Sequence, residues 1–173
     1  MRKIALLVLT FMNVLTLSAQ KKEPATLEET IEYLSQKSKE IIGYTKLTMS
    51  QKVFINKRII ADGHVKKTSN GIEISSSYKT EGDAAITSTL FNPKHIVSIT
   101  NNSSETVNSE SPVGTLSIIF VGKVALNNSG GNSSAVDKAT FNFLQSDPDN
   151  AKRIINAFMH LKKLYKIEDS SFE

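Results

Sequence analysis

The sequence predicts an α+β domain in which an antiparallel β-sheet is flanked by an N-terminal and a C-terminal helix. Residues 26–43 and 147–165 carry apolar side chains at helical spacing. Between them, residues 44–145 repeatedly alternate apolar and polar side chains, the two-residue period of half-buried strands. We therefore expect about seven strands, in a sheet or a partly open barrel, with the C-terminal helix as a cap.

The first segment is set apart from this domain because it has the layout of a secretory signal peptide. Two basic residues precede an apolar run over residues 4–17, and small or polar residues follow. The run is shorter than the roughly 20 residues that a membrane span needs. We expect cleavage after Ala19 or Gln20, and the alternative is an uncleaved N-terminal anchor.

These boundaries assign residues 1–20 to the signal peptide and residues 21–173 to a single domain. The protein is then exported, to the periplasm or out of the cell, and is not integral to the membrane after cleavage.

Composition excludes several classes of function. The chain of 173 residues has no Cys, which rules out a disulfide scaffold, a thiol nucleophile and a Cys-ligated metal. The 21 basic residues fall to 19 when Arg2 and Lys3 leave with the signal, against 17 acidic residues, so the net charge is about +2. The basic residues are spread along the chain, and we expect no nucleic-acid partner.

The N-terminal helix has a clear start and a clear end. Thr26 and Glu29 have the spacing of a capping box, in which each side chain accepts a hydrogen bond from the other residue's backbone N–H. Gly43 supplies the stop. One narrow apolar stripe follows helical spacing and is interrupted by Ser38; it consists of Leu27, Ile31, Leu34 and Ile41.

The strand region divides at turn signals. We expect turns at residues 80–83 and at Asn92-Pro93, and loops in the Asn- and Ser-rich stretches over residues 100–114 and 127–134. Gly122 marks either a bend in one long strand or a tight joint between two strands. The segments expected to form strands are residues 45–55, 72–79, 84–91, 94–100, 115–127 and 138–145.

The C-terminal helix is the most apolar part of the domain. Asp147 is a favourable N-cap and Pro148 suits the first helical position. Lys162 lies at the edge of the apolar stripe, and we expect its long stem to snorkel past apolar surface. We expect this helix to cover the open side of the sheet with a stripe of Ala151, Ile154, Phe158, Leu161 and Tyr165.

Several stretches together resemble small exported Bacteroidota proteins with a pleckstrin-homology-like (PH-like) domain. The similar features are a leader ending in "SAQ", the "TLEETIEYL" helix, the "FNPKHIVSI" strand region and the final "DNAKRIINAFMHLKKLY" helix. Phe158 and Met159 stand where a Leu–Lys pair is more usual. The resemblance implies a barrel of strands plugged by a C-terminal helix, and it carries over no functional residue.

One basic segment is a candidate binding site. If residues 52–67 fold back as a hairpin near Asp62-Gly63, five cations share one edge, and PH-like folds often bind anionic groups beside such a hairpin. A solvated basic edge that discourages strand-to-strand aggregation is the alternative. The five candidates for an anion or partner site are Lys52, Lys57, Arg58, Lys66 and Lys67.

Other motifs give no catalytic, metal or cofactor site. None of His64, His95 and His160 has a second ligand at metal spacing. "DPDN" lacks the Gly and the distal Glu of a calcium loop, "SGGNSS" lacks the Gly-Lys-Ser/Thr ending of a phosphate loop, and no Gly-x-Ser-x-Gly elbow occurs. We expect neither a cofactor nor a metal.

The sequence favours an exported, non-enzymatic binding or interaction module of the cell envelope. Its partner would be a protein, a peptide or an envelope ligand, held by a sheet edge or a loop. The alternative is a small-ligand or lipid carrier with an apolar pocket between sheet and helix.

Overall fold

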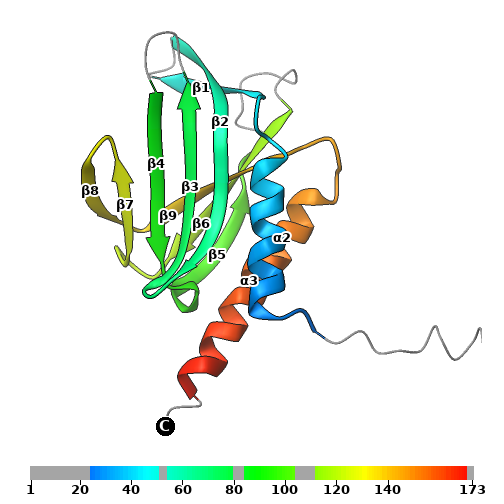
Figure 1. Ribbon diagram of the computed structural model, residues 1–173, viewed down its shortest axis with the longest axis vertical. Helices are drawn as coiled ribbons and strands as arrows, with labels where there is room; N and C mark the ends of the chain where they lie inside the picture. Colours follow the sequence, from blue (N-terminus) through cyan, green and yellow to red (C-terminus); the bar gives the residue numbers. More distant parts are fainter. Residues whose placement is uncertain (1–23, 51–53, 80–83, 104–111, 171–173) are drawn as a thin grey trace, which may run out of the picture.

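The computed structural model describes residues 24–50, 54–79, 84–103 and 112–170; the predicted signal peptide lies outside them. These residues form an α+β fold with two antiparallel sheets (Figure 1), which confirms the predicted fold class. The helices are α2 (Leu27–Lys39) and α3 (Asn150–Ser170). The strands are β1 (Thr45–Ser50), β2 (Phe54–Thr68), β3 (Gly71–Lys79), β4 (Ala84–Phe91), β5 (Ile96–Asn101), β6 (Val113–Phe120), β7 (Ala125–Ser129), β8 (Asn132–Val136) and β9 (Lys138–Leu144).

The strands form two open sheets rather than one closed barrel. Six strands pair in the order β1-β2-β3-β4-β7-β8, and the other three pair in the order β5-β6-β9. The chain passes from one sheet to the other at the short 3-10 helix η1 (Pro93–His95), after β6 and after β8. Helices α2 and α3 lie together at one side of the sheets, and the β7–β8 hairpin lies at the opposite side (Figure 1).

The predicted capping box at the start of α2 is confirmed. The Thr26 backbone N–H donates to Glu29 Oε2 over 2.8 Å, and the Glu29 N–H donates to Thr26 Oγ1 over 3.2 Å. Ser38, the polar member of the apolar stripe, is buried and donates its hydroxyl to the Ser35 carbonyl over 2.9 Å. This internal partner lets the helix bury its full stripe.

The expectation of a single strand over residues 45–55 is wrong. This segment contains β1 and the start of β2, which pair antiparallel with Ser50 opposite Phe54. The apolar alternation continues through the reversal, and no Gly, Pro or Asn marks it. Residues 51–53, at the reversal, lie outside the described part of the chain.

The hairpin considered near Asp62-Gly63 does not form, because β2 continues through both residues. The strand has a β-bulge between Ile60 and Asp62, and the reversal into β3 comes only after Thr68. A Cβ on Gly63 would lie 2.7 Å from the backbone oxygen of Ser38 in α2. Glycine is needed here because the helix packs directly on the strand, not because the chain turns.

The polar segment over residues 127–134 is a hairpin and not the expected loop. β7 and β8 pair across it, and Gly130 and Gly131 form its turn with φ angles of 55° and 82°. Two consecutive positive φ angles suit the two-residue turn whose twist matches that of the paired strands. Turn geometry and backbone hydrogen bonds define the polar tip of this hairpin, and its apolar pairs, Ala125 with Val136 and Leu126 with Ala135, lie at the far end of the two strands.

Two alternatives were open at Gly122, and the chain forms two strands. β6 ends at Phe120 and β7 begins at Ala125, and the two strands belong to different sheets. Gly122 has a φ of 71°, in the left-handed region that favours glycine. The chain therefore changes sheet within a few residues.

The C-terminal helix is confirmed but begins at Asn150, later than expected. Asp147 caps the preceding turn: its Oδ1 accepts a hydrogen bond from the Asp149 N–H over 2.9 Å, and its carboxylate pairs with Arg153. The Asn150 side chain donates to the Leu144 carbonyl over 2.8 Å. That bond ties the start of α3 to the end of β9.

Together, α2 and α3 cover one face of the three-stranded sheet. Ile154 and Phe158 of α3 are fully buried, and the Phe158 ring meets the Phe141 ring of β9 edge-on, with centroids 5.3 Å apart. Lys162 donates to the Ile96 carbonyl over 2.6 Å, a partner that the sequence did not predict. The main core thus lies between the helices and the sheets.

Candidate functional site

The three-stranded sheet has two chemically different faces because side chains alternate along its strands. One face is apolar and buried; it consists of Leu116, Ile118, Phe120, Ala139, Phe141 and Phe143. The other face bears mostly hydroxyl, amide and amine groups, from Thr115, Ser117, Lys138, Thr140 and Asn142. It also carries Ile119, Val113 and Leu144, and the last two pack at its end in a second, smaller apolar cluster with Ile41, Ile60 and Tyr78. The polar face points toward the six-stranded sheet, where Asn142 bonds to Tyr78 of β3.

The facing side of the six-stranded sheet changes from apolar to polar along its strands. Ile72 of β3 lies opposite Phe91 of β4, and both side chains are buried in the main core. Four residues along β3, Ser76 lies opposite Thr87 on the same face. Polar surfaces of the two sheets therefore face each other at this level.

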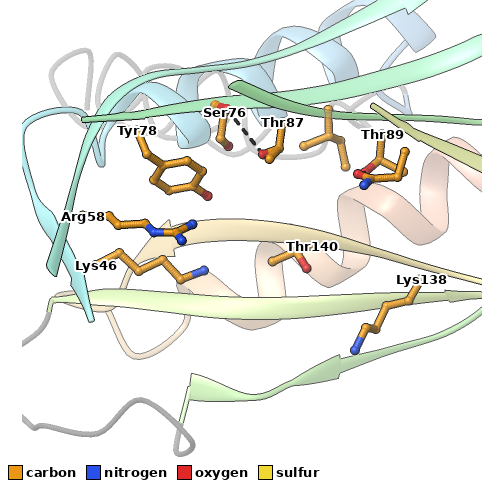
Figure 2. Close-up of a pocket in the computed structure, with 10 residues that line it drawn as sticks. Lys46, Arg58, Ser76, Tyr78, Thr87, Thr89, Lys138 and Thr140 are labelled. Atoms are coloured by element: carbon orange, nitrogen blue, oxygen red, sulfur yellow. Dashed lines mark hydrogen bonds between the residues drawn. The ribbon is translucent and has the colours of Figure 1, made fainter. Parts of the chain in front are cut away.

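A cavity of about 330 Å³ lies between these polar surfaces (Figure 2). Strands β1, β2, β3, β4 and β7 line it from one sheet, and β9 lines it from the other. The lining side chains are Lys46, Arg58, Ile74, Ser76, Tyr78, Thr87, Thr89, Asn127, Lys138 and Thr140. A single aliphatic residue, Ile74, stands among nine polar or charged ones.

Two cations lie side by side at one end of the cavity. The β1–β2 register places Lys46 directly opposite Arg58, and Figure 2 shows their head groups close together below the Tyr78 ring. Lys138 lines the cavity from β9 and lies apart from this pair in Figure 2. Among the described residues, no carboxylate lies within ion-pair distance of Lys46 or Arg58.

Hydrogen bonds fix the position of the Lys46 ammonium. It donates to Asn142 Oδ1 over 2.5 Å, and Asn142 Nδ2 donates to the Tyr78 hydroxyl over 2.9 Å. Thr115 Oγ1 also contacts Asn142 Oδ1, at 3.4 Å. These bonds join β1, β3, β6 and β9, so the network connects the two sheets across the end of the cavity.

The charge on Lys46 is costly in this position. Burial, and next the positive charge of Arg58, lower the pKa of Lys46 from 10.5 to about 8. Desolvation disfavours an ammonium, and a like charge nearby disfavours it further. Lys46 is thus a cation that the fold holds in unfavourable surroundings.

The five cations predicted as a binding edge do not form one cluster. Arg58 lines the cavity, whereas Lys66 is exposed and pairs with Glu73 at 3.3 Å. Lys67 is exposed near the far end of β2, roughly 30 Å along the strand from Arg58. Lys52, and the side chain of Lys57, lie outside the described residues.

Sequence reasoning missed most of the residues that line the cavity. The two-residue alternation along residues 45–55 and 138–145 places Lys46 and Asn142 on the polar sides of their strands. Both assignments are right about alternation, but they do not reveal that the two polar faces meet. The only local signal was a Lys and an Arg in consecutive strands, and the pairing of β1 with β2 was itself not predicted.

Two of the three histidines, His64 and His160, have structural partners for their rings. The His64 ring lies 3.0 Å from Ser75 Oγ, and His160 Nε2 lies 2.7 Å from the Ala25 carbonyl oxygen. Within the described residues, no three His, Cys, Asp or Glu side chains gather closely enough to hold a metal ion.

No protein-family model, curated protein or solved structure matches this chain. The resemblance to exported Bacteroidota proteins with a PH-like domain therefore stays a prediction. Over the described residues, neither helix combines the length and the apolar content that crossing a bilayer requires.

Proposed function

We propose that this protein is an exported, non-enzymatic binding module of the bacterial cell envelope, and that the cavity between its two sheets is the binding site. The observation that carries the proposal is the meeting of two polar sheet faces. Packed sheets usually bury apolar side chains between them, because that burial stabilises the fold. Here the apolar face of β6 and β9 packs on the helices, and polar groups surround the space between the sheets.

The cavity supports a small ligand in preference to a protein or a peptide. Its volume of about 330 Å³ lies at the low end of the range of small-molecule sites. Binding of a protein or a peptide at a sheet edge or a loop is the other mode considered. It would leave these inward-facing polar groups without a role.

The carrier alternative is supported in a modified form. An apolar pocket between sheet and helix has little room, because Leu34, Phe141 and Phe158 fill that interface and are almost fully buried. The cavity between the two sheets is polar instead. A polar ligand suits such a lining better than an acyl chain, which would leave buried polar groups unsatisfied.

Binding without chemistry is the simpler role for this lining. General acid–base and nucleophilic catalysis commonly pair a nucleophile with a His or a carboxylate within hydrogen-bond reach. The residues described around the cavity are hydroxyl, amide, amine and guanidinium groups, and include no His, Asp or Glu.

Native mass spectrometry of the protein purified gently from a bacterial envelope, or incubated with envelope extract, tests the proposal. Thr87→Phe places a ring in the cavity, and Ser98→Phe places the same ring at an exposed position on β5 as the control. We expect a small-molecule adduct on the wild type and on the control variant, and none on Thr87→Phe. Equal adducts on all three proteins, or none on any, would contradict the proposed site.

A further inference from the structure

We infer that the ligand of this cavity is a hydroxylated small molecule with one carboxylate or phosphate group, such as a sugar acid or a sugar phosphate. Lys46 and Arg58 would hold the anionic group, and the hydroxyl-bearing wall would hold the rest of the molecule. The inference rests on the proposed function, which supplies the cavity as the binding site.

The first argument is the pairing of two like charges. Lys46 and Arg58 lie directly opposite each other on β1 and β2, and both side chains are half-buried. Like charges at directly opposed positions destabilise a sheet. Because no described carboxylate lies close enough to compensate them, an anion in the cavity is the partner that would make this arrangement favourable.

The second argument is the unused donor capacity of this pair. An ammonium has three N–H donors, and Lys46 uses one of them on Asn142 Oδ1. A guanidinium presents donors in a planar fork that matches the oxygens of a carboxylate or a phosphate. Tyr78 lies beside both head groups, and its hydroxyl accepts a bond from Asn142, which leaves its own proton free to donate.

The third argument is the remainder of the lining. Four hydroxyl side chains border the cavity; they are Ser76, Thr87, Thr89 and Thr140. Thr89 Oγ1 donates to Asn127 Oδ1 over 3.2 Å, so the Asn127 amide nitrogen stays available. Hydroxyl groups both donate and accept, so this wall suits a ligand that is itself rich in hydroxyl groups. An apolar ligand would gain contact only with Ile74 and the Tyr78 ring among these side chains.

Isothermal titration calorimetry with four defined probes tests this ligand class. The probes are glucose 6-phosphate, glucuronate, neutral glucose and inorganic phosphate. We expect at least one of the two sugar anions to bind about tenfold or more tightly than glucose, since hydrogen bonds to charged groups are the stronger ones. We also expect the sugar anion to bind more tightly than phosphate alone, because phosphate lacks the groups that meet the hydroxyl wall.

Three variants show whether Lys46 and Arg58 are responsible for binding the sugar anion. Lys46→Met and Arg58→Met should each weaken binding of the sugar anion about tenfold or more, whereas Lys66→Met should leave it unchanged. Lys66 is the matched control because it lies on the same strand as Arg58, outside the cavity, and pairs with Glu73. Circular dichroism verifies that each variant is folded, and Lys46→Gln replaces Lys46→Met if the latter is not.

A second readout is the pH dependence of binding. The ionisable groups that face Lys46 are Arg58 of β2, Tyr78 of β3 and Lys138 of β9. Affinity for the sugar anion should fall above about pH 8 in the wild type, because Lys46 loses its proton there, and should not fall in this range in Lys46→Met.

The outcomes separate this inference from the proposed function. If glucose binds as tightly as the sugar anions, and Thr87→Phe abolishes its binding, the cavity is a binding site but the anionic ligand class is wrong. If the sugar anions bind equally well to Lys46→Met, or bind no more tightly than about 1 mM, the inference is overturned. Binding to vesicles that contain phosphatidylglycerol, without binding to either sugar anion, would assign the anionic group to a lipid and also overturn it.

Discussion

At the scale of single residues, Lys46 makes the stability of the protein depend on pH. Its pKa is about 8 in the folded protein, against an ordinary value of 10.5. Between these values the unfolded chain holds a proton that the folded protein has lost, so the free energy of unfolding rises as the pH increases through this window. The separation between the two pKa values corresponds to a rise in the free energy of unfolding of roughly 3 kcal/mol at most across this window.

Lys46→Met should remove this dependence. We expect the variant to be more stable than the wild type at pH 7, and we expect the difference to shrink as the pH approaches 10. Urea unfolding at several pH values measures it, and Lys66→Met is the control because Lys66 is exposed. A wild-type advantage at pH 7 would show that the bond from Lys46 to Asn142 outweighs the cost of burying the charge.

Gly63 is the second residue with a specific structural task. Gly63→Ala should lower the free energy of unfolding by roughly 2–3 kcal/mol, because the added methyl group meets the Ser38 backbone oxygen. Gly122→Ala is the comparison: no atom lies within 4 Å of its added Cβ, and only the left-handed backbone opposes it, at about 1 kcal/mol. Thermal or urea unfolding measures both. Equal losses would mean that α2 can move away from β2 without cost.

At the scale of helices and strands, α3 supplies much of the core. Phe158→Ala should lower the free energy of unfolding by roughly 3–5 kcal/mol, because it removes a fully buried ring that packs on Phe141. Ile167→Ala, in the exposed end of the same helix, should change it by less than about 0.5 kcal/mol. Chemical denaturation followed by circular dichroism measures both variants. A small loss for Phe158→Ala would show that neighbouring side chains collapse into the space.

The elements that sequence predicts well are those with a strong local signal. The capping box of α2, the apolar stripe of α3 and the alternation of β3 and β9 are all present where expected. The errors occur where a local signal was missing or was misread. No turn residue marks the reversal between β1 and β2, Gly63 resembled a turn but is a helix contact, and the polar β7–β8 hairpin resembled a loop.

The site was harder to predict than the fold because it depends on which strands become neighbours. Arg58 was among the candidates, but its partner Lys46 joins it only through the β1–β2 pairing. Asn142 reaches both Lys46 and Tyr78 only because one sheet is laid over the other. These contacts span long stretches of sequence, and no spacing rule describes them.

At the scale of the whole molecule, export is a prediction that can be measured directly. When the complete chain is expressed with its own N-terminus in a Gram-negative host, we expect the periplasmic product to begin at Gln20 or Lys21. Intact mass and N-terminal sequencing identify the cleavage. Leu9→Arg interrupts the apolar run and should keep the precursor in the cytoplasm. An unprocessed wild-type product bound to the inner membrane would support the uncleaved anchor instead.

The two faces of the three-stranded sheet have a consequence for how this protein can change. On this sheet the residues of the main core point toward the helices, and Lys138 and Thr140 point toward the cavity. Substitutions at Thr140 or Lys138 therefore leave the packing beneath the helices intact. Ligand specificity can therefore change during evolution by single substitutions around the cavity, while other residues maintain the stability of the fold.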